Sequence, residues 1–75
     1  MTPAQVKTLR ERLGLTQNAF ARTFAISIQA LRNWEQGARS PRGPARSLLI
    51  IIDKEPEAAM RALKSASKAK TKGKV

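Results

Sequence analysis

The sequence predicts an all-α fold of five short helices followed by a disordered basic tail. Apolar residues recur at helical spacing, and no stretch alternates polar and apolar residues with the period of a strand. Capping residues, prolines and glycines mark the ends of the expected helices. The 75 residues allow one domain, whose small core makes oligomerisation a common way to gain stability.

The first two helices have well-defined ends in the sequence. Thr2 and Gln5 form a capping box at the start of the first helix, and Gly14 ends it. Thr16 caps a second helix, which we expect over residues 17–23. Both helices are therefore short, with a tight connection between them.

A break at Ala25 and Ile26 separates the second helix from the third. Ser27 caps the third helix and Gly37 ends it. Residues 37–43 are rich in Gly, Pro, Ser and Arg, which is typical of a loop.

Prolines begin the last two helices. Pro44 starts a fourth helix to about Lys54, and Pro56 starts a fifth helix to about residue 64. Residues 65–75 hold too few apolar side chains to offset the entropy of ordering, so we expect them to be disordered. The domain thus spans residues 1–64, ahead of a lysine-rich tail.

Composition excludes several functions. The chain has no cysteine and no histidine, so disulfides, a catalytic triad and a zinc site are excluded. The five acids show no ligand spacing, and we predict no catalytic residue, metal or cofactor. The longest apolar run, Leu48–Ile52, is too short to span a bilayer, so we expect a cytoplasmic protein.

The net charge of +10 favours a polyanionic partner. Half of this charge belongs to the five lysines from residue 64 onward, Lys64, Lys68, Lys70, Lys72 and Lys74, and residues 1–63 are basic without them. Nucleic acid is the first candidate and an anionic membrane the second. A domain that is simply basic and solvated is the alternative.

Residues 15–37, LTQNAFARTFAISIQALRNWEQG, hold the most specific pattern in the sequence. Two short helices are joined by a tight turn, with the small Ala21 where they cross. This pattern resembles the helix-turn-helix of the lambdoid phage repressor and Cro family, also called XRE, over about residues 4–54. The resemblance implies a lambda-repressor-like fold with its helix-turn-helix at residues 16–36. Most members of that family have Gly at the position of Ala25, so we expect a strained turn here.

The third helix has an exposed polar face. With Leu31 at the centre of the buried face, Gln29, Arg32 and Asn33 lie opposite and Ile28 lies at the edge. Amides can pair with adenine, a guanidinium with guanine, and Ile with a thymine methyl group. The resemblance implies that this helix enters the major groove, so we predict these four residues to read bases. A solvated polar face is the alternative.

Phosphate contacts are expected around this helix. The set contains helix N-terminal residues and two loop arginines, namely Thr16, Gln17, Ser27, Arg39 and Arg42. In the resembling family this loop lies along the DNA backbone. The arginines have an alternative interpretation as solvated charges.

Arg10 and Glu35 have a structural role by the same resemblance. The family pairs the positions of Arg10 and Glu35 in an ion bridge between the first and third helices. Trp34 falls on the inner stripe of its helix, so we predict a core residue and not a stacking platform for bases.

A two-fold interface is expected on the last two helices, residues 44–64. If Leu48, Leu49 and Ile52 face inward, Ile50 and Ile51 face outward. We predict a homodimer interface made of Ile50, Ile51, Ala59, Met60 and Leu63. Alternatively, the fifth helix folds back and covers the isoleucines itself.

Three functions follow from these observations. The first is a homodimeric repressor that binds double-stranded DNA at an inverted repeat. The second is an antitoxin that also binds a toxin protein, since the pattern after Trp34 looks closest to HigA- and MqsA-type antitoxins. The third is a sequence-tolerant architectural DNA binder that depends on the lysine tail.

Overall fold

The structure is a computed structural model that describes the backbone of residues 1–73 and the side chains of residues 1–64. Within residues 1–73 the chain forms five helices and no strand: α1 (Pro3–Arg12), α2 (Gln17–Thr23), α3 (Ile28–Gln36), α4 (Pro44–Lys54) and α5 (Pro56–Gly73). The predicted all-α class is confirmed, and the bounds of α2 and α4 are the predicted ones.

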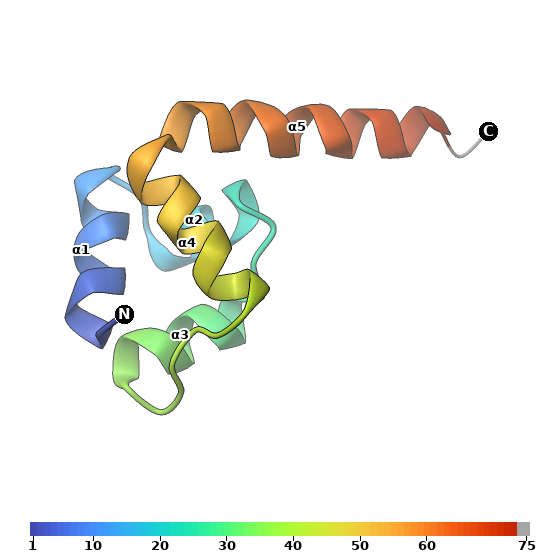
Figure 1. Cartoon of the computed structure of the whole chain (residues 1–75). Helices are drawn as coiled ribbons and strands as arrows, with labels where there is room; N and C mark the ends of the chain where they lie inside the picture. The colour runs from blue at the N-terminus through green and yellow to red at the C-terminus, as the bar shows by residue number, and fades with distance from the viewer. Residues whose placement is uncertain (74–75) are drawn as a thin grey trace.

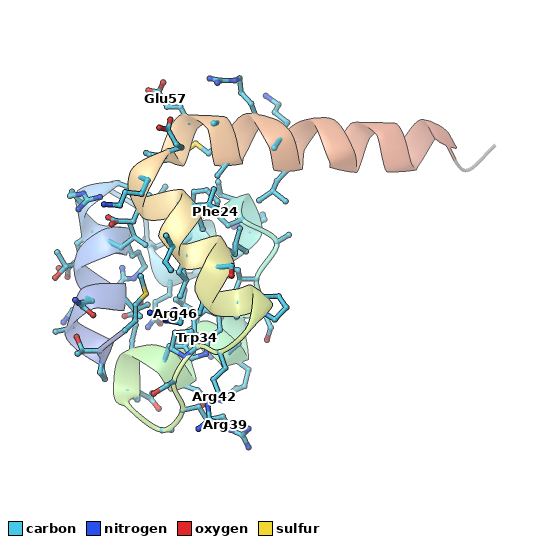
Figure 2. The ribbon with its side chains drawn as sticks, in the orientation of Figure 1. Phe24, Trp34, Arg39, Arg42, Arg46 and Glu57 are labelled. Carbon is cyan, nitrogen blue, oxygen red and sulfur yellow. The ribbon has the colours of Figure 1, made fainter. Side chains whose placement is uncertain are left out.

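The first four helices form the body of the molecule (Figure 1). Helix α5 crosses one end of this body and continues beyond it (Figure 1). Helix α3 and the loop over residues 37–43 lie at the opposite end, where the labelled side chains of Arg39 and Arg42 lie close together (Figure 2). No helix within the described residues is both long enough and apolar enough to cross a membrane.

The predicted helix caps are present. Thr2 and Gln5 exchange two hydrogen bonds, from the Gln5 amide to Thr2 Oγ1 at 3.1 Å and from the Thr2 amide to Gln5 Oε1 at 2.8 Å. At the start of α2, Thr16 Oγ1 accepts the Ala19 amide at 3.1 Å. Gly37 ends α3 with a left-handed φ of +83°.

The turn between α2 and α3 is closed by backbone hydrogen bonds and contains a strained residue. The Ile26 amide donates to the carbonyl of Ala21 at 2.8 Å. Ala25 has a φ of +56°, which makes it the one non-glycine residue of the described part of the chain with a positive φ. The expected left-handed turn is therefore formed in spite of the Cβ atom of Ala25.

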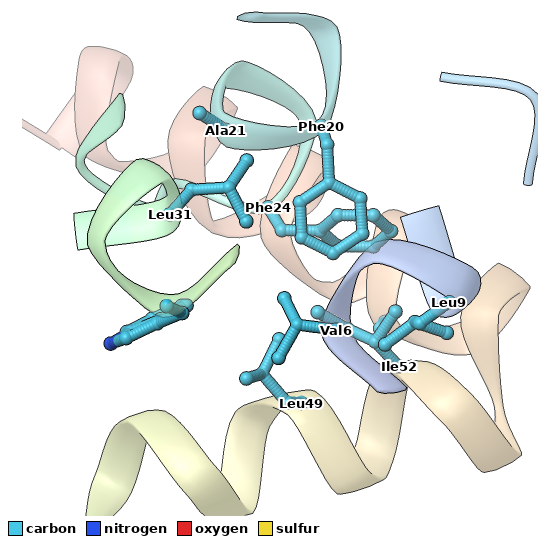
Figure 3. Close-up of a cluster of buried hydrophobic side chains, with 10 residues drawn as sticks. Val6, Leu9, Phe20, Ala21, Phe24, Leu31, Leu49 and Ile52 are labelled. Atoms are coloured by element: carbon cyan, nitrogen blue, oxygen red, sulfur yellow. The ribbon is translucent and has the colours of Figure 1, made fainter. Parts of the chain in front are cut away.

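The core lies where all five helices meet (Figure 3). Helices α1 and α2 contribute Val6, Leu9, Phe20 and Ala21 to it, and Phe24 follows at the end of α2. The other buried side chains are Leu31 and Trp34 from α3, Leu49 and Ile52 from α4, and Ala59 from α5. The rings of Phe20 and Phe24 pack at 4.8 Å between centroids. Trp34 is 8% exposed, which confirms its assignment to the core.

Helix α5 is longer than the sequence predicted. It continues to Gly73, into the segment that we expected to be disordered, and residues 74 and 75 lie outside the described residues. Residues 65–72 are Ser, Ala, Lys and Thr, without proline or glycine, so the helix meets no residue that stops it until Gly73. Helix α5 therefore extends beyond the predicted end at about residue 64.

Ala59 corrects one residue of the predicted dimer interface. Its side chain is 5% exposed and belongs to the core of the single chain, so it is not available to a second chain. Ala59 lies on the side of α5 that packs against the body. Ile50 and Ile51 are 38% and 51% exposed, so α5 does not cover them.

Candidate nucleic-acid interface

Helix α3 is held by two neighbouring helices and leaves one face to solvent. Leu31 is fully buried, Trp34 is nearly so, and both α1 and α2 pack against α3. Gln29 and Arg32 are exposed on the other side, and Ile28 and Asn33 are half-buried beside them. Gln29, Arg32 and Asn33 therefore share one accessible face of α3, and Ile28 at its edge also packs against the core.

The ion pair predicted between Arg10 and Glu35 fixes this helix to α1. Arg10 Nε donates to Glu35 Oε2 at 2.7 Å, and Arg10 Nη2 donates to Glu35 Oε1 at 3.0 Å. The side chains are only 13% and 6% exposed. A bidentate pair of this kind restricts both distance and orientation, so it holds α3 in a defined position on α1.

Both charges of this pair are stabilised. Burial disfavours the carboxylate of Glu35, but the hydrogen bonds from Arg10 and Gln17, together with the positive charges of Arg10 and Lys7, outweigh burial and lower the pKa of Glu35. The hydrogen bond to Glu35 raises the pKa of Arg10, against the effect of burial. Arg10 Nη1 also donates to the carbonyl oxygen of Leu15 at 3.0 Å, which ties the start of α2 to the same network.

Gln17 has a second role that the sequence did not indicate. Its Nε2 donates to Glu35 Oε1 at 3.2 Å, so its side chain is oriented by the ion pair. One Nε2 hydrogen and the backbone amide at the first position of α2 remain for an anion. Gln17 can therefore still contact a phosphate, but one hydrogen of its side-chain amide is already bonded to Glu35.

Gln29 and Asn33 are joined on the polar face of α3. Gln29 Nε2 donates to Asn33 Oδ1 at 3.2 Å, one helical turn away. Gln29 Oε1 and one Nε2 hydrogen remain, which is the acceptor and donor pair that matches the major-groove edge of adenine. Arg32 has no hydrogen-bond or ion-pair partner among the side chains of residues 1–64, so its guanidinium is accessible to an external acceptor.

The other predicted phosphate contacts surround this face. The hydroxyls of Thr16 and Ser27 accept backbone amides at the starts of α2 and α3, which leaves each hydroxyl hydrogen to donate to an anion. Arg39 and Arg42 are exposed and line a hollow of about 540 Å³ beside Trp34. The amide of Arg39 donates to the Asn33 carbonyl at 3.3 Å, so the loop is attached to the end of α3.

Arg46 is a cation that the sequence analysis overlooked. It is exposed on the first turn of α4, four residues after Arg42 (Figure 2). Helical spacing could not have grouped it with Arg42, because Arg42 precedes the helix and the non-helical Gly43 (φ +54°, ψ −129°) separates them. Arg46 therefore adds positive charge to the start of α4.

The described side chains contain no group of three potential metal ligands. The five acids of the sequence all lie within residues 1–64, and two of them, Glu35 and Asp53, pair with arginines.

The arrangement on α2, α3 and the loop offers hydrogen-bond donors and positive charge to a duplex. Fold and surface together define a DNA-binding helix-turn-helix protein.

Comparison with known proteins agrees with this class. The model of the helix-turn-helix family matches residues 6–45, more than half of the chain. The chain belongs to this helix-turn-helix family.

A solved structure extends the agreement beyond residues 6–45. The crystal structure of an HTH XRE-family like protein from Agrobacterium tumefaciens is 41% identical, with a TM-score of 0.76 over 84% of this chain and 98% of that chain. The resemblance to the XRE and Cro-like family is thereby confirmed.

A curated relative matches as well. Antitoxin HigA-2 of Vibrio cholerae serotype O1 is 35% identical over 57 residues, which are 76% of this chain and 55% of the relative. This chain therefore spans about half the length of that relative. The resemblance to HigA-type antitoxins agrees with this match.

Proposed function

We propose that the chain is a sequence-specific transcriptional repressor that binds duplex DNA through α3. The observation that carries the proposal is the exposed polar face of α3, with Gln29 and Arg32 accessible while Leu31 anchors the helix in the core. Amide and guanidinium groups at the start of such a helix are suited to base edges in the major groove. The hydroxyls of Thr16 and Ser27 and the arginines of the loop supply the phosphate contacts.

A homodimer is part of the proposal. Ile50 and Ile51 form an exposed apolar patch on α4, and Met60 and Leu63 on α5 are half-buried. A second copy of the chain that covers such a patch would gain the free energy of burying it. Two copies would place their α3 helices about 34 Å apart, which matches an inverted repeat with half-sites one turn of DNA apart. A repressor of this kind would be nucleoid-associated.

Selection of bound duplexes from a random pool tests the proposal. A repressor returns a motif, and a dimer returns a motif with two-fold symmetry. A sequence-tolerant architectural binder would return no motif, and its affinity would collapse on deletion of residues 64–75. For the repressor, the same deletion would lower affinity moderately and reduce the salt dependence of binding.

The antitoxin relative favours a second function. HigA-2 is named as an antitoxin, and its similarity covers three quarters of this chain. In this second proposal the chain binds a toxin protein as well as its operator. A toxin gene next to this gene, and co-purification of the two products, would support it; a gene without such a neighbour would count against it.

A further inference from the structure

We infer that a groove between α2 and α5 binds an acidic amphipathic helix of a partner protein. The groove has a volume of about 630 Å³ and lies where the end of α2 and the turn at Ala25 face the first half of α5. It is separate from the polar face of α3, which lies at the other end of the molecule (Figure 1). The inference does not depend on DNA binding by α3.

The shape of the groove suits a short helix. Its lining residues on α5 include Glu57, Met60, Arg61 and Lys64, which recur at the spacing of one helical face. With a rise of 1.5 Å per residue this face is about 10 Å long, the length of two turns of helix. Volumes of several hundred Å³ are typical of sites that enclose a compact ligand or a few anchoring side chains.

The floor of the groove is apolar. Ala25, Met60 and Leu63 line it, and both Met60 and Leu63 are half-buried although they pack against the core. Two or three apolar side chains of a partner helix would complete their burial. DNA has no equivalent side chains, so this floor distinguishes a protein partner from a duplex.

The rim of the groove is basic. Arg22, Arg61 and Lys64 line it, against one acid, Glu57, and all four side chains are exposed. Three cations around an apolar floor complement a helix with carboxylates beside its apolar stripe. Like charges on a basic partner would oppose binding.

The charge of this chain does not complement the groove. A second copy would bring the same cations to the groove and has only five acids to offer it, and the homodimer proposed above is centred on Ile50 and Ile51, which do not line the groove. Glu35 is occupied by Arg10, Asp53 by Arg12, and Glu57 is already in the wall of the groove. The occupant is therefore an acidic segment of a different protein, and binding at this end leaves α3 accessible.

Methyl NMR of the full chain tests the inference directly. The sequence has two methionines, Met1 and Met60, so labelling of methionine methyl groups gives one probe in the groove and one outside it. The probe ligand is a synthetic helical peptide with leucines on one stripe and glutamates beside it. Two matched peptides replace the glutamates with lysines or the leucines with serines. We expect the acidic leucine peptide to shift the Met60 signal and leave Met1 unchanged, and both matched peptides to have no effect.

Charge reversal in the protein is the second arm. Arg22→Glu combined with Arg61→Glu is expected to weaken the acidic peptide about tenfold or more, since each exposed charge pair contributes up to about 1 kcal/mol. Lys7→Glu combined with Lys54→Glu changes the net charge equally outside the groove and is expected to leave peptide affinity unchanged. All four sites are exposed, and circular dichroism verifies the fold of each variant.

Three results would overturn the inference. One is equal binding of the acidic and lysine peptides. Another is equal loss of affinity in the two double variants, which would indicate net charge alone. The third is a Met60 shift caused by a DNA duplex that also displaces the peptide, which would make the groove a nucleic-acid surface.

Discussion

Gln29 donates a hydrogen bond to Asn33 across one turn of α3, at 3.2 Å between Nε2 and Oδ1. The bond favours one direction of the Gln29 amide before any ligand arrives. Less side-chain entropy is then lost when this amide meets a base. The two residues are expected to act as a unit in recognition.

The first prediction concerns base reading by Gln29. Gln29→Ala is expected to weaken binding to the selected operator by about 1–3 kcal/mol, with little effect on scrambled DNA, because a base contact is lost. In a protein that already carries Asn33→Ala, Gln29→Ala should cause a smaller loss of operator affinity than it does alone, since the two residues are coupled. Gel shifts with operator and scrambled duplexes measure both effects. Equal losses on the two duplexes would refute the base-reading role.

The second prediction concerns the loop. Arg39→Ala is expected to weaken all duplexes similarly and to lower the slope of log affinity against log salt by about 1, as loss of one phosphate contact should. Titrations at several salt concentrations measure the slope. Lys54→Ala, at the far end of α4, is the matched control. A loss confined to the operator would show instead that Arg39 reads sequence.

The third prediction concerns the ion pair between Arg10 and Glu35. Glu35→Ala is expected to lower the free energy of unfolding by about 3 kcal/mol, because Arg10 is left partly buried without its partner. Chemical denaturation followed by circular dichroism measures the change. Asp53→Ala removes the exposed pair with Arg12 and is expected to cost less than about 1 kcal/mol.

The same pair predicts a pH dependence. The pKa of Glu35 is lower in the folded than in the unfolded state, so its contribution is complete above the unfolded value of about 4.3. The contribution is lost as the pH falls through the folded pKa. Thermal unfolding between neutral and acid pH should therefore show a loss of stability that is smaller in Glu35→Gln. An equal loss in both proteins would assign the acid sensitivity to other carboxylates.

The fourth prediction concerns the strained turn. Ala25→Gly is expected to raise the free energy of unfolding by about 0.5–1 kcal/mol. The free energy gained by relieving the strain at the φ of +56° is larger than the free energy lost because glycine gives the unfolded chain more entropy. Ala38→Gly, in the exposed loop at a residue without a positive φ, is the control and should not stabilise. Destabilisation by Ala25→Gly would mean that the methyl group contributes more than the strain costs.

The fifth prediction concerns the dimer. Ile51→Glu is expected to shift the protein toward monomer in sedimentation experiments and to weaken operator binding, while the fold is retained because Ile51 is 51% exposed. Ile52→Glu would instead unfold the domain, since Ile52 is fully buried. An unchanged mass for Ile51→Glu would place the interface elsewhere.

Helix ends and the inner face of α3 were predictable because their causes are local. A capping hydroxyl and the glycine that follows a helix act within a few residues, and Leu31 and Trp34 follow the helical period. The turn at Ala25 was predictable from the family resemblance. These are the features on which the candidate DNA interface depends.

The remaining features required tertiary contacts. The bond from Gln17 to Glu35 joins residues 18 positions apart, and no local pattern indicates it. Ala59 is buried because α5 packs against α4 and α2, and a helical period alone does not specify which face of α5 does so. The length of α5 depends on helix propensity, whereas the prediction of its end relied on apolar burial.

A solved structure of the chain bound to its selected operator would show which helix meets the bases. We expect α3 in the major groove, with Gln29 and Arg32 at hydrogen-bond distance from base edges and Arg39 at the phosphates. A complex in which the polar face of α3 is turned away from the duplex, with DNA held by other helices, would contradict it.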